Sequence, residues 1–114
     1  MYAMLKGKVV AGSLNILMVA AENDALAGGK VGGVGDVVRD VPTALIDLPE
    51  FEGVVSVVCP SYGFLHENAT ARLGTIEFSF AGEQLIAELF EVSGKRPRDG
   101  IRQLVLHHSA FATD

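Results

Sequence analysis

Two long apolar runs stand out in the first half of the chain. Residues 14–21 read LNILMVAA, a nearly continuous apolar run of strand length. Such a run is typical of a strand buried on both faces of a parallel sheet. Residues 54–59 read VVSVVC, rich in β-branched valine, and this second run ends at Cys59-Pro60. Both runs are predicted to be strands.

A helical pattern separates the two runs. Apolar residues recur there at three- and four-residue spacing and predict a helix with one apolar face, made of Val34, Val37, Val38, Val41, Ala44, Leu45 and Leu48. Pro42 lies inside this pattern and is expected to kink the helix or to mark its effective start. Strand, helix and strand in this order predict a right-handed βαβ unit with parallel strands.

The second half of the chain alternates with a period of two. Ile76, Phe78 and Phe80 are separated by polar residues, and further strands are predicted at 85–92 and 101–107. The short, glycine-containing connection at 81–84 predicts a β-hairpin. The predicted fold class is therefore α/β, a βαβ unit plus a β-hairpin extension. Residues 1–13 are expected to be a leader and residues 14–114 one partial domain.

Composition narrows the functional classes. The 114 residues are 49% hydrophobic with a formal net charge of −5, which suits one globular domain and argues against a general binder of nucleic acid or anionic membrane. No apolar stretch reaches the length of a transmembrane helix. Lys6 and Lys8 precede an apolar run as in a signal peptide, but acidic residues follow that run. The single Cys59 excludes a disulfide framework and favours a cytoplasmic protein.

The most informative stretch is glycine-rich and opens the predicted helix. Residues 28–36 read GGKVGGVGD, directly after the first strand and its polar loop. A glycine-rich loop at a helix N-terminus offers free backbone N–H groups to an anion, and Lys30 can add a charge. The P-loop and dinucleotide fingerprints both fail at their required positions. Phosphate or nucleotide-sugar binding and a merely flexible helix start stay open at this point.

The same stretch carries a resemblance to a known family. Ala21-Glu22, the segment 30–37 (KVGGVGDV), Asp40-Val41-Pro42 and Pro60-Ser61-Tyr62-Gly63 resemble the glycogen and starch synthases of glycosyltransferase family 5. The likeness extends over most of residues 14–111. It implies a three-layer Rossmann-like domain, the N-terminal part of a two-domain GT-B enzyme. It also implies transfer of glucose from ADP-glucose to an α-1,4-glucan with retention at the anomeric carbon.

The resemblance also implies roles for particular residues. Lys30 would contact the phosphates of the donor, and Gly32 and Gly33 would offer their backbone to them. Asp36 would be the catalytic residue at the active-site cleft, and Glu22 would lie near the donor and acceptor pocket. Tyr62 follows the second strand, where open α/β sheets bind ligands. No metal and no cofactor is implied, since lysine and helix N-termini would stabilise the leaving diphosphate.

The chain departs from the family pattern in three ways. The loop between Glu22 and Lys30 is longer than usual, and His107-His108 stands where the family often has Asp-His. The family's second domain has no counterpart in these residues, so the isolated chain is expected to be inactive. The alternatives are a non-catalytic nucleotide- or glucan-binding module and an oligomerising remnant. His66 is expected in an exposed loop, and Ser61 has no visible triad partners.

Self-association is the last expectation from the sequence. One helix covers at most part of one face of a sheet of about five strands. The apolar side chains of the later strands would then stay exposed, and such a patch favours a symmetric homodimer; they are Ile76, Phe78, Phe80, Leu85, Leu89, Phe90 and Val105.

Overall fold

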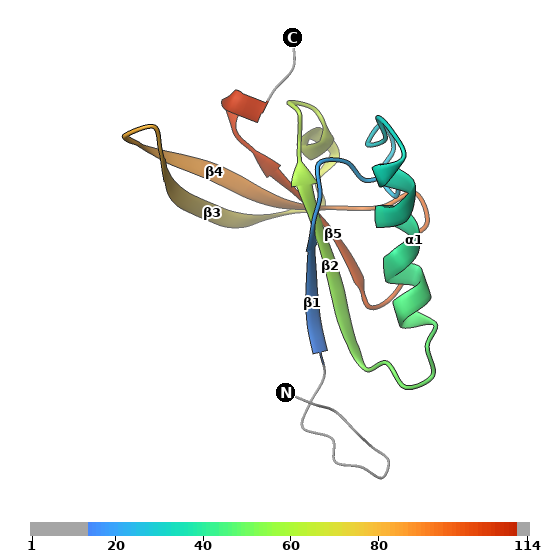
Figure 1. The fold of residues 1–114 in the computed structure, drawn as a ribbon. Helices are drawn as coiled ribbons and strands as arrows, with labels where there is room; N and C mark the ends of the chain where they lie inside the picture. Colours follow the sequence, from blue (N-terminus) through green and yellow to red (C-terminus); the bar gives the residue numbers. More distant parts are fainter. Residues whose placement is uncertain (1–13, 112–114) are drawn as a thin grey trace.

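The computed structural model describes residues 14–111, so the predicted leader at 1–13 lies outside the described residues. Five strands and one α-helix form the fold (Figure 1). They are β1 (Leu14–Val19), α1 (Val34–Ile46), β2 (Gly53–Pro60), β3 (Ala71–Phe80), β4 (Glu83–Val92) and β5 (Ile101–His107), with short 3-10 turns η1 (Leu65–Asn68) and η2 (Ser109–Phe111). The predicted order of strand, helix and strands is confirmed.

The strands form one mixed sheet in the order β1-β2-β5-β4-β3. β1 and β2 are parallel, as the βαβ pattern predicts, and β5 pairs parallel with β2 from Val55 opposite Ile101 onward. β4 is antiparallel to both β5 and β3. The last strand of the chain therefore lies in the middle of the sheet. Short-range patterns could not predict this insertion.

The hairpin of β3 and β4 turns at Ala81 and Gly82. Both residues have positive φ, 53° and 82°, the combination that a tight two-residue hairpin turn requires. Both strands are longer than predicted, and Figure 1 shows the hairpin as a ribbon that extends away from α1. The predicted hairpin is confirmed.

The buried face of α1 differs from the predicted one. Gly35, Val38 and Pro42 are buried, whereas Val34, Val37 and Val41 are exposed. The helix begins at Val34, so Pro42 does not mark its start. Pro42 lies inside the helix, and its ring is fully buried. Leu45 and Ile46 also pack against the core under the helix, so the buried face is rotated from the predicted one and keeps only part of it, Val38 and Leu45.

β1 is not buried on both faces, contrary to its apolar pattern. It lies at the edge of the sheet, where Leu17 and Val19 are 61% and 76% exposed. Ile16 and Met18 face α1 and pack against the buried core of Val38, Val55 and Val57. The described residues thus form two layers, one α-helix on one face of the sheet, and they do not include a third layer. No described helix is long and apolar enough to cross a membrane.

A second core cluster lies beyond the helix, at the carboxyl ends of β2 and β5. It joins loop residues to strand residues: Leu26, Cys59, Leu65, Val92 and Val105. Leu26 comes from the loop after β1 and Leu65 from η1, so both loops are anchored in the same cluster. Burial raises the pKa of the Cys59 thiol to about 11. This cluster is the base of the candidate site.

Candidate functional site

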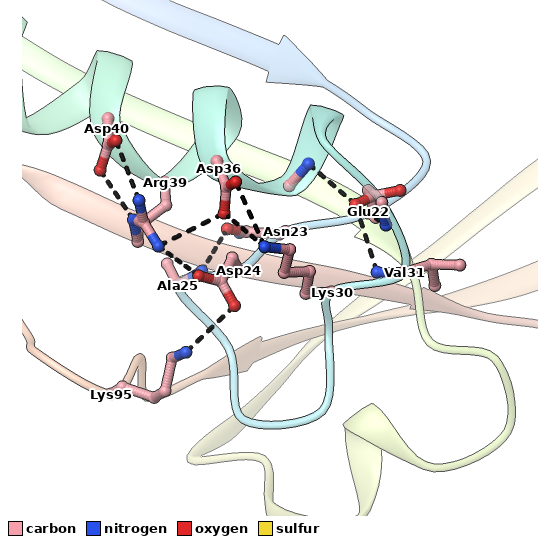
Figure 2. Close-up of polar contacts among 12 residues, drawn as sticks. Glu22, Asn23, Asp24, Ala25, Lys30, Val31, Asp36, Arg39, Asp40 and Lys95 are labelled. Carbon is pink, nitrogen blue, oxygen red and sulfur yellow. Dashed lines mark hydrogen bonds and ion pairs between the residues drawn. The ribbon is translucent and has the colours of Figure 1, made fainter.

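Glu22 is the centre of the glycine-rich loop. It follows β1, and its carboxylate Oε1 accepts hydrogen bonds from three backbone N–H groups (Figure 2): Val31 at 3.2 Å, Gly32 at 2.7 Å and Gly35 at 2.8 Å. The side chain therefore closes the loop onto the first turn of α1. A carboxylate is favoured there because the helix dipole and unpaired N–H groups attract negative charge.

These bonds change the charge balance of Glu22. The hydrogen bond from Gly32, more than those from Gly35 and Val31, lowers the pKa of Glu22 below its ordinary value, and nearby Lys30 adds to this. The sequence predicted free N–H groups facing an anion. The structure corrects this for Val31, Gly32 and Gly35, whose N–H groups already bind the carboxylate of the chain itself.

Lys30 and Asp36 form an ion pair beside the hydrogen bonds that Glu22 accepts. Lys30 Nζ lies 3.0 Å from Asp36 Oδ1, and both side chains are roughly half exposed. The hydrogen bond to Asp36 raises the pKa of Lys30. The structure thus brings together the lysine predicted to bind phosphate and the aspartate predicted to be catalytic. Gly33 adjoins them, and it is exposed with open space where a Cβ would be.

Arg39 and Asp24 extend the network across α1. Arg39 pairs with Asp24 and Asp40 and, more distantly, with Asp36 at 3.5 Å (Figure 2). Lys95, from the β4–β5 connection, lies 3.2 Å from Asp24, and this contact lowers the pKa of Asp24. The network holds three cations and, with Glu22, four carboxylates. An anionic ligand must therefore compete with internal carboxylates for every donor.

Asn23 anchors the loop after β1 to strand β5. It is fully buried, its Nδ2 donates to Gln103 of β5 at 2.7 Å, and its Oδ1 accepts from the N–H of Ala25 at 2.9 Å. A buried amide needs such partners, because an unpaired one is costly. Sequence analysis did not identify Asn23. Its position between Glu22 and Asp24 gave no signal, since Gln103 is distant in the sequence.

Tyr62 reaches the same edge of the sheet from the end of β2. Its hydroxyl donates to the carbonyl of Ala21 at 2.5 Å, next to Glu22. Its φ of 55° lies in the left-handed region, which is uncommon for a residue other than glycine. Glu22, Lys30, Gly32, Gly33, Asp36 and Tyr62 therefore gather around the carboxyl ends of β1 and β2 and the start of α1.

His66 and His107, which are distant in the sequence, lie close together in the fold. His66 is half-buried, not in an exposed loop position, and its ring stacks on His107 with centroids 3.9 Å apart. Its Nδ1 lies 2.6 Å from Oγ of Ser61, which is fully buried. This resembles a nucleophile and base pair only in distance, because the buried hydroxyl is closed to a substrate. His108 points to the other face, towards Phe78.

The described residues contain no group of three side chains that could hold a metal ion. An open groove of about 980 Å³ lies between α1 and the β4–β5 connection, and its walls include Arg39, Asp47, Lys95 and Arg98. None of the six predicted site residues lines it. The candidate site is therefore the charged edge at the ends of β1 and β2, which adjoins this groove through Arg39, Asp40 and Lys95.

Comparison with known families shows which protein family the chain matches. The profile described as the starch synthase catalytic domain matches residues 15–114, which is nearly the whole chain. The chain belongs to this family. The match includes all six residues of the candidate site, so they lie within a catalytic domain of the glycosyltransferase class. No individual curated protein matches the chain closely enough to count as a relative.

Proposed function

We propose that this chain forms the first part of the N-terminal Rossmann-like domain of a GT-B glucosyltransferase. Its reaction would transfer glucose from ADP-glucose to an α-1,4-glucan, with retention at the anomeric carbon. Membership of the starch synthase family supports the reaction class. The observation that carries the proposal is the gathering of Lys30, Gly32 and Asp36 around Glu22 at the carboxyl edge of β1 and β2.

The chemistry of this edge suits a nucleoside diphosphate such as ADP. Lys30 is exposed and can exchange Asp36 for a phosphate oxygen. Gly33 is open to close approach of a ligand, because nothing lies where its Cβ would be. The N-terminus of α1 adds a dipole that favours the leaving diphosphate. In this proposal no metal or cofactor takes part, and Asp36 faces the reacting sugar once Lys30 has turned to the phosphates.

Donor binding by this edge alone would be weak. One lysine and a few N–H groups provide only a few kcal/mol before the cost of ordering the ligand, and here internal carboxylates compete for them. Retaining transfer between two domains would need groups from both. We therefore expect the 114 residues to bind ADP weakly and not to transfer glucose. Measuring ADP release from ADP-glucose with glycogen tests the second expectation, and sustained turnover would contradict it.

A titration with ADP followed by NMR tests the site itself. Amide signals between Gly32 and Val37 should move, and Lys30→Ala should abolish the shifts. Lys95→Ala is the matched control, since both lysine side chains are 46% exposed and both pair with an aspartate of one network. Equal losses in the two variants would show a general charge effect in place of a phosphate site.

Self-association is a second candidate, favoured by the exposed apolar residues of β1. Leu17 and Val19 lie on the face opposite α1, at an open sheet edge. The predicted patch was partly wrong, because Val105 is fully buried and Phe90 packs against the second core cluster, whereas Ile76 and Phe80 are exposed. We propose a homodimer through the exposed apolar residues of the sheet. A non-catalytic nucleotide- or glucan-binding module and an oligomerising remnant stay as alternatives. We place the protein in the cytoplasm. Sedimentation equilibrium decides the dimer, since a mass of 12.0 kDa independent of concentration would exclude it.

A further inference from the structure

Ser61 is the most tightly bound residue near the candidate site. It ends up fully buried just after β2, and its N–H donates to the carbonyl of Leu106 at 2.9 Å. Its own carbonyl accepts from Phe64 and Leu65, at 3.2 and 3.0 Å. Its Oγ accepts from the N–H of His66 at 3.0 Å and lies 2.6 Å from Nδ1 of the same histidine. Every polar group of Ser61 is therefore engaged.

His66 connects this serine to β5. Because Ser61 Oγ accepts from the backbone of His66, its hydroxyl proton is free to point at Nδ1 of the ring. The ring stacks on His107 with an interplanar angle of 24°, and Phe90 flanks it at 5.4 Å. Ser61, His66 and His107 thus form a three-residue unit, called here the serine–histidine clamp. It joins the end of β2 and η1 to the end of β5.

The segment held by the clamp contacts the connection between β1 and α1, which contains the glycine-rich loop, at three of its residues. Tyr62 donates its hydroxyl to Ala21. Phe64 packs against Gly28, where a Cβ would come within 3.1 Å of the ring. Leu65 and Leu26 share the second core cluster. The left-handed backbone at Tyr62 is unfavourable by itself and persists only where its surroundings fix it.

We propose that Ser61, His66 and His107 are positioning residues of the candidate donor site. They hold residues 61–65 in the shape in which Tyr62, Phe64 and Leu65 support the glycine-rich loop from its far side. None of the three needs to touch the donor. The inference rests on the proposed function for its consequence on binding, but its structural part concerns the loop alone.

Two variants of His66 separate the hydrogen bond from the stacking. His66→Phe keeps an aromatic ring against His107 but leaves the buried Ser61 hydroxyl without its Nδ1 partner. His66→Asn loses the ring and keeps an acceptor near the position of Nδ1. We expect His66→Phe to shift the amide signals of residues 21–29 and to weaken ADP binding about fivefold or more. We expect His66→Asn to recover much of both.

Two controls distinguish positioning from a general loss of stability. His108→Ala removes the neighbouring histidine, whose ring contacts Phe78 and Phe111 on the other face, and should leave residues 21–29 and ADP binding unchanged. Val55→Ala destabilises the core cluster under α1, which the clamp does not contact. Urea unfolding ranks the stability of all variants. At equal loss of stability, only the His66→Phe variant should move the loop signals.

The outcomes separate the two proposals. Loop signals that follow His66→Phe but not Val55→Ala, together with weaker ADP binding, support both. If wild-type protein binds no ADP while the loop signals still follow His66→Phe, the proposed function fails and the clamp stands as the support of the loop. If His66→Phe leaves the amide signals of residues 21–29 unchanged, or if Val55→Ala changes them equally, the clamp is overturned whether or not ADP binds.

Discussion

Two loops meet at the carboxyl edge of the sheet, and they are held in different ways. The later part of the glycine-rich loop depends on charges that are largely exposed, with Lys30 and Asp36 both over 40% accessible, whereas Asn23 and Leu26 at its start are buried. The segment 60–69 depends on buried groups, with Ser61 at 0% and Leu65 at 9%. Exposed ion pairs contribute little to stability, whereas buried hydrogen bonds and apolar contacts contribute more. The comparison indicates an adaptable loop supported by a rigid one.

The largest expected effect comes from the rigid side. Leu65→Ala removes a buried side chain from the cluster that also contains Leu26 and Cys59, and should lower the free energy of unfolding by about 3 kcal/mol. Urea unfolding measures it. Phe64→Ala, at a side chain that is 43% exposed, is the control and should cost clearly less. Equal costs would mean that burial does not distinguish the two positions.

A smaller effect is expected inside the glycine-rich loop. A Cβ at Gly35 would lie 2.7 Å from Oε1 of Glu22, so Gly35→Ala must displace the carboxylate from the amides. We expect a loss of about 1 kcal/mol, because an exposed side chain can move aside at the expense of its hydrogen bonds. Gly33→Ala has open space and should be nearly neutral. Thermal unfolding of both variants would contradict this if Gly33→Ala were the more damaging.

Acid should weaken the hydrogen bonds that Glu22 accepts from the glycine-rich loop. The pKa of Glu22 is lowered in the folded state from an ordinary value of 4.5, chiefly by the N–H of Gly32. Its contribution is therefore complete above pH 4.5 and is lost as pH falls below that value through the lowered pKa. Glu22→Gln should be less stable than wild type at neutral pH, and the difference should shrink on acidification. A difference in stability that stays constant with pH would show that the Glu22 carboxylate does not stabilise the loop.

Salt should have the smallest effect. Raising the ionic strength from about 0.1 M to about 1 M shortens the screening length from about 10 Å to about 3 Å. The contacts of Lys30 with Asp36 and of Lys95 with Asp24 should weaken, with little change in the unfolding midpoint. Amide exchange should quicken in residues 22–33 and not in 60–69. Similar quickening in both segments would show that the two loops open together.

Much of the local structure was predictable. The run at 53–60, the alternation that gives β3, and the Gly82 turn carry their own signals, because side-chain period and turn chemistry act over a few residues. The grouping of Lys30 with Asp36 follows from their closeness in sequence, since Lys30 lies in the loop just before α1 and Asp36 in the first turn of the helix. The predicted buried face of α1 was only partly right, because Val38 and Leu45 pack into the core while Val34, Val37 and Val41 are exposed, and spacing cannot choose between adjoining apolar stripes.

Contacts between distant residues could not be predicted from one sequence. Asn23 bonds Gln103, Tyr62 bonds Ala21 and His66 stacks on His107, and each pair depends on where the loops come to lie. The exposed position of Leu17 and Val19 has the same origin, because an apolar run does not say whether its strand is central or at an edge.

The sequence by itself determined which segments are strands, which is the helix and where glycine opens a loop, since these follow from local periodicity and backbone preference. It also carried the family motif, which needs no structure to be read. The tertiary structure alone decided that β5 lies between β2 and β4 and that Glu22 folds back onto the amides of Gly32 and Gly35. The reason is physical. Strand order and the contacts that close a loop depend on burial and hydrogen bonding summed over the whole chain. No single segment can therefore determine them.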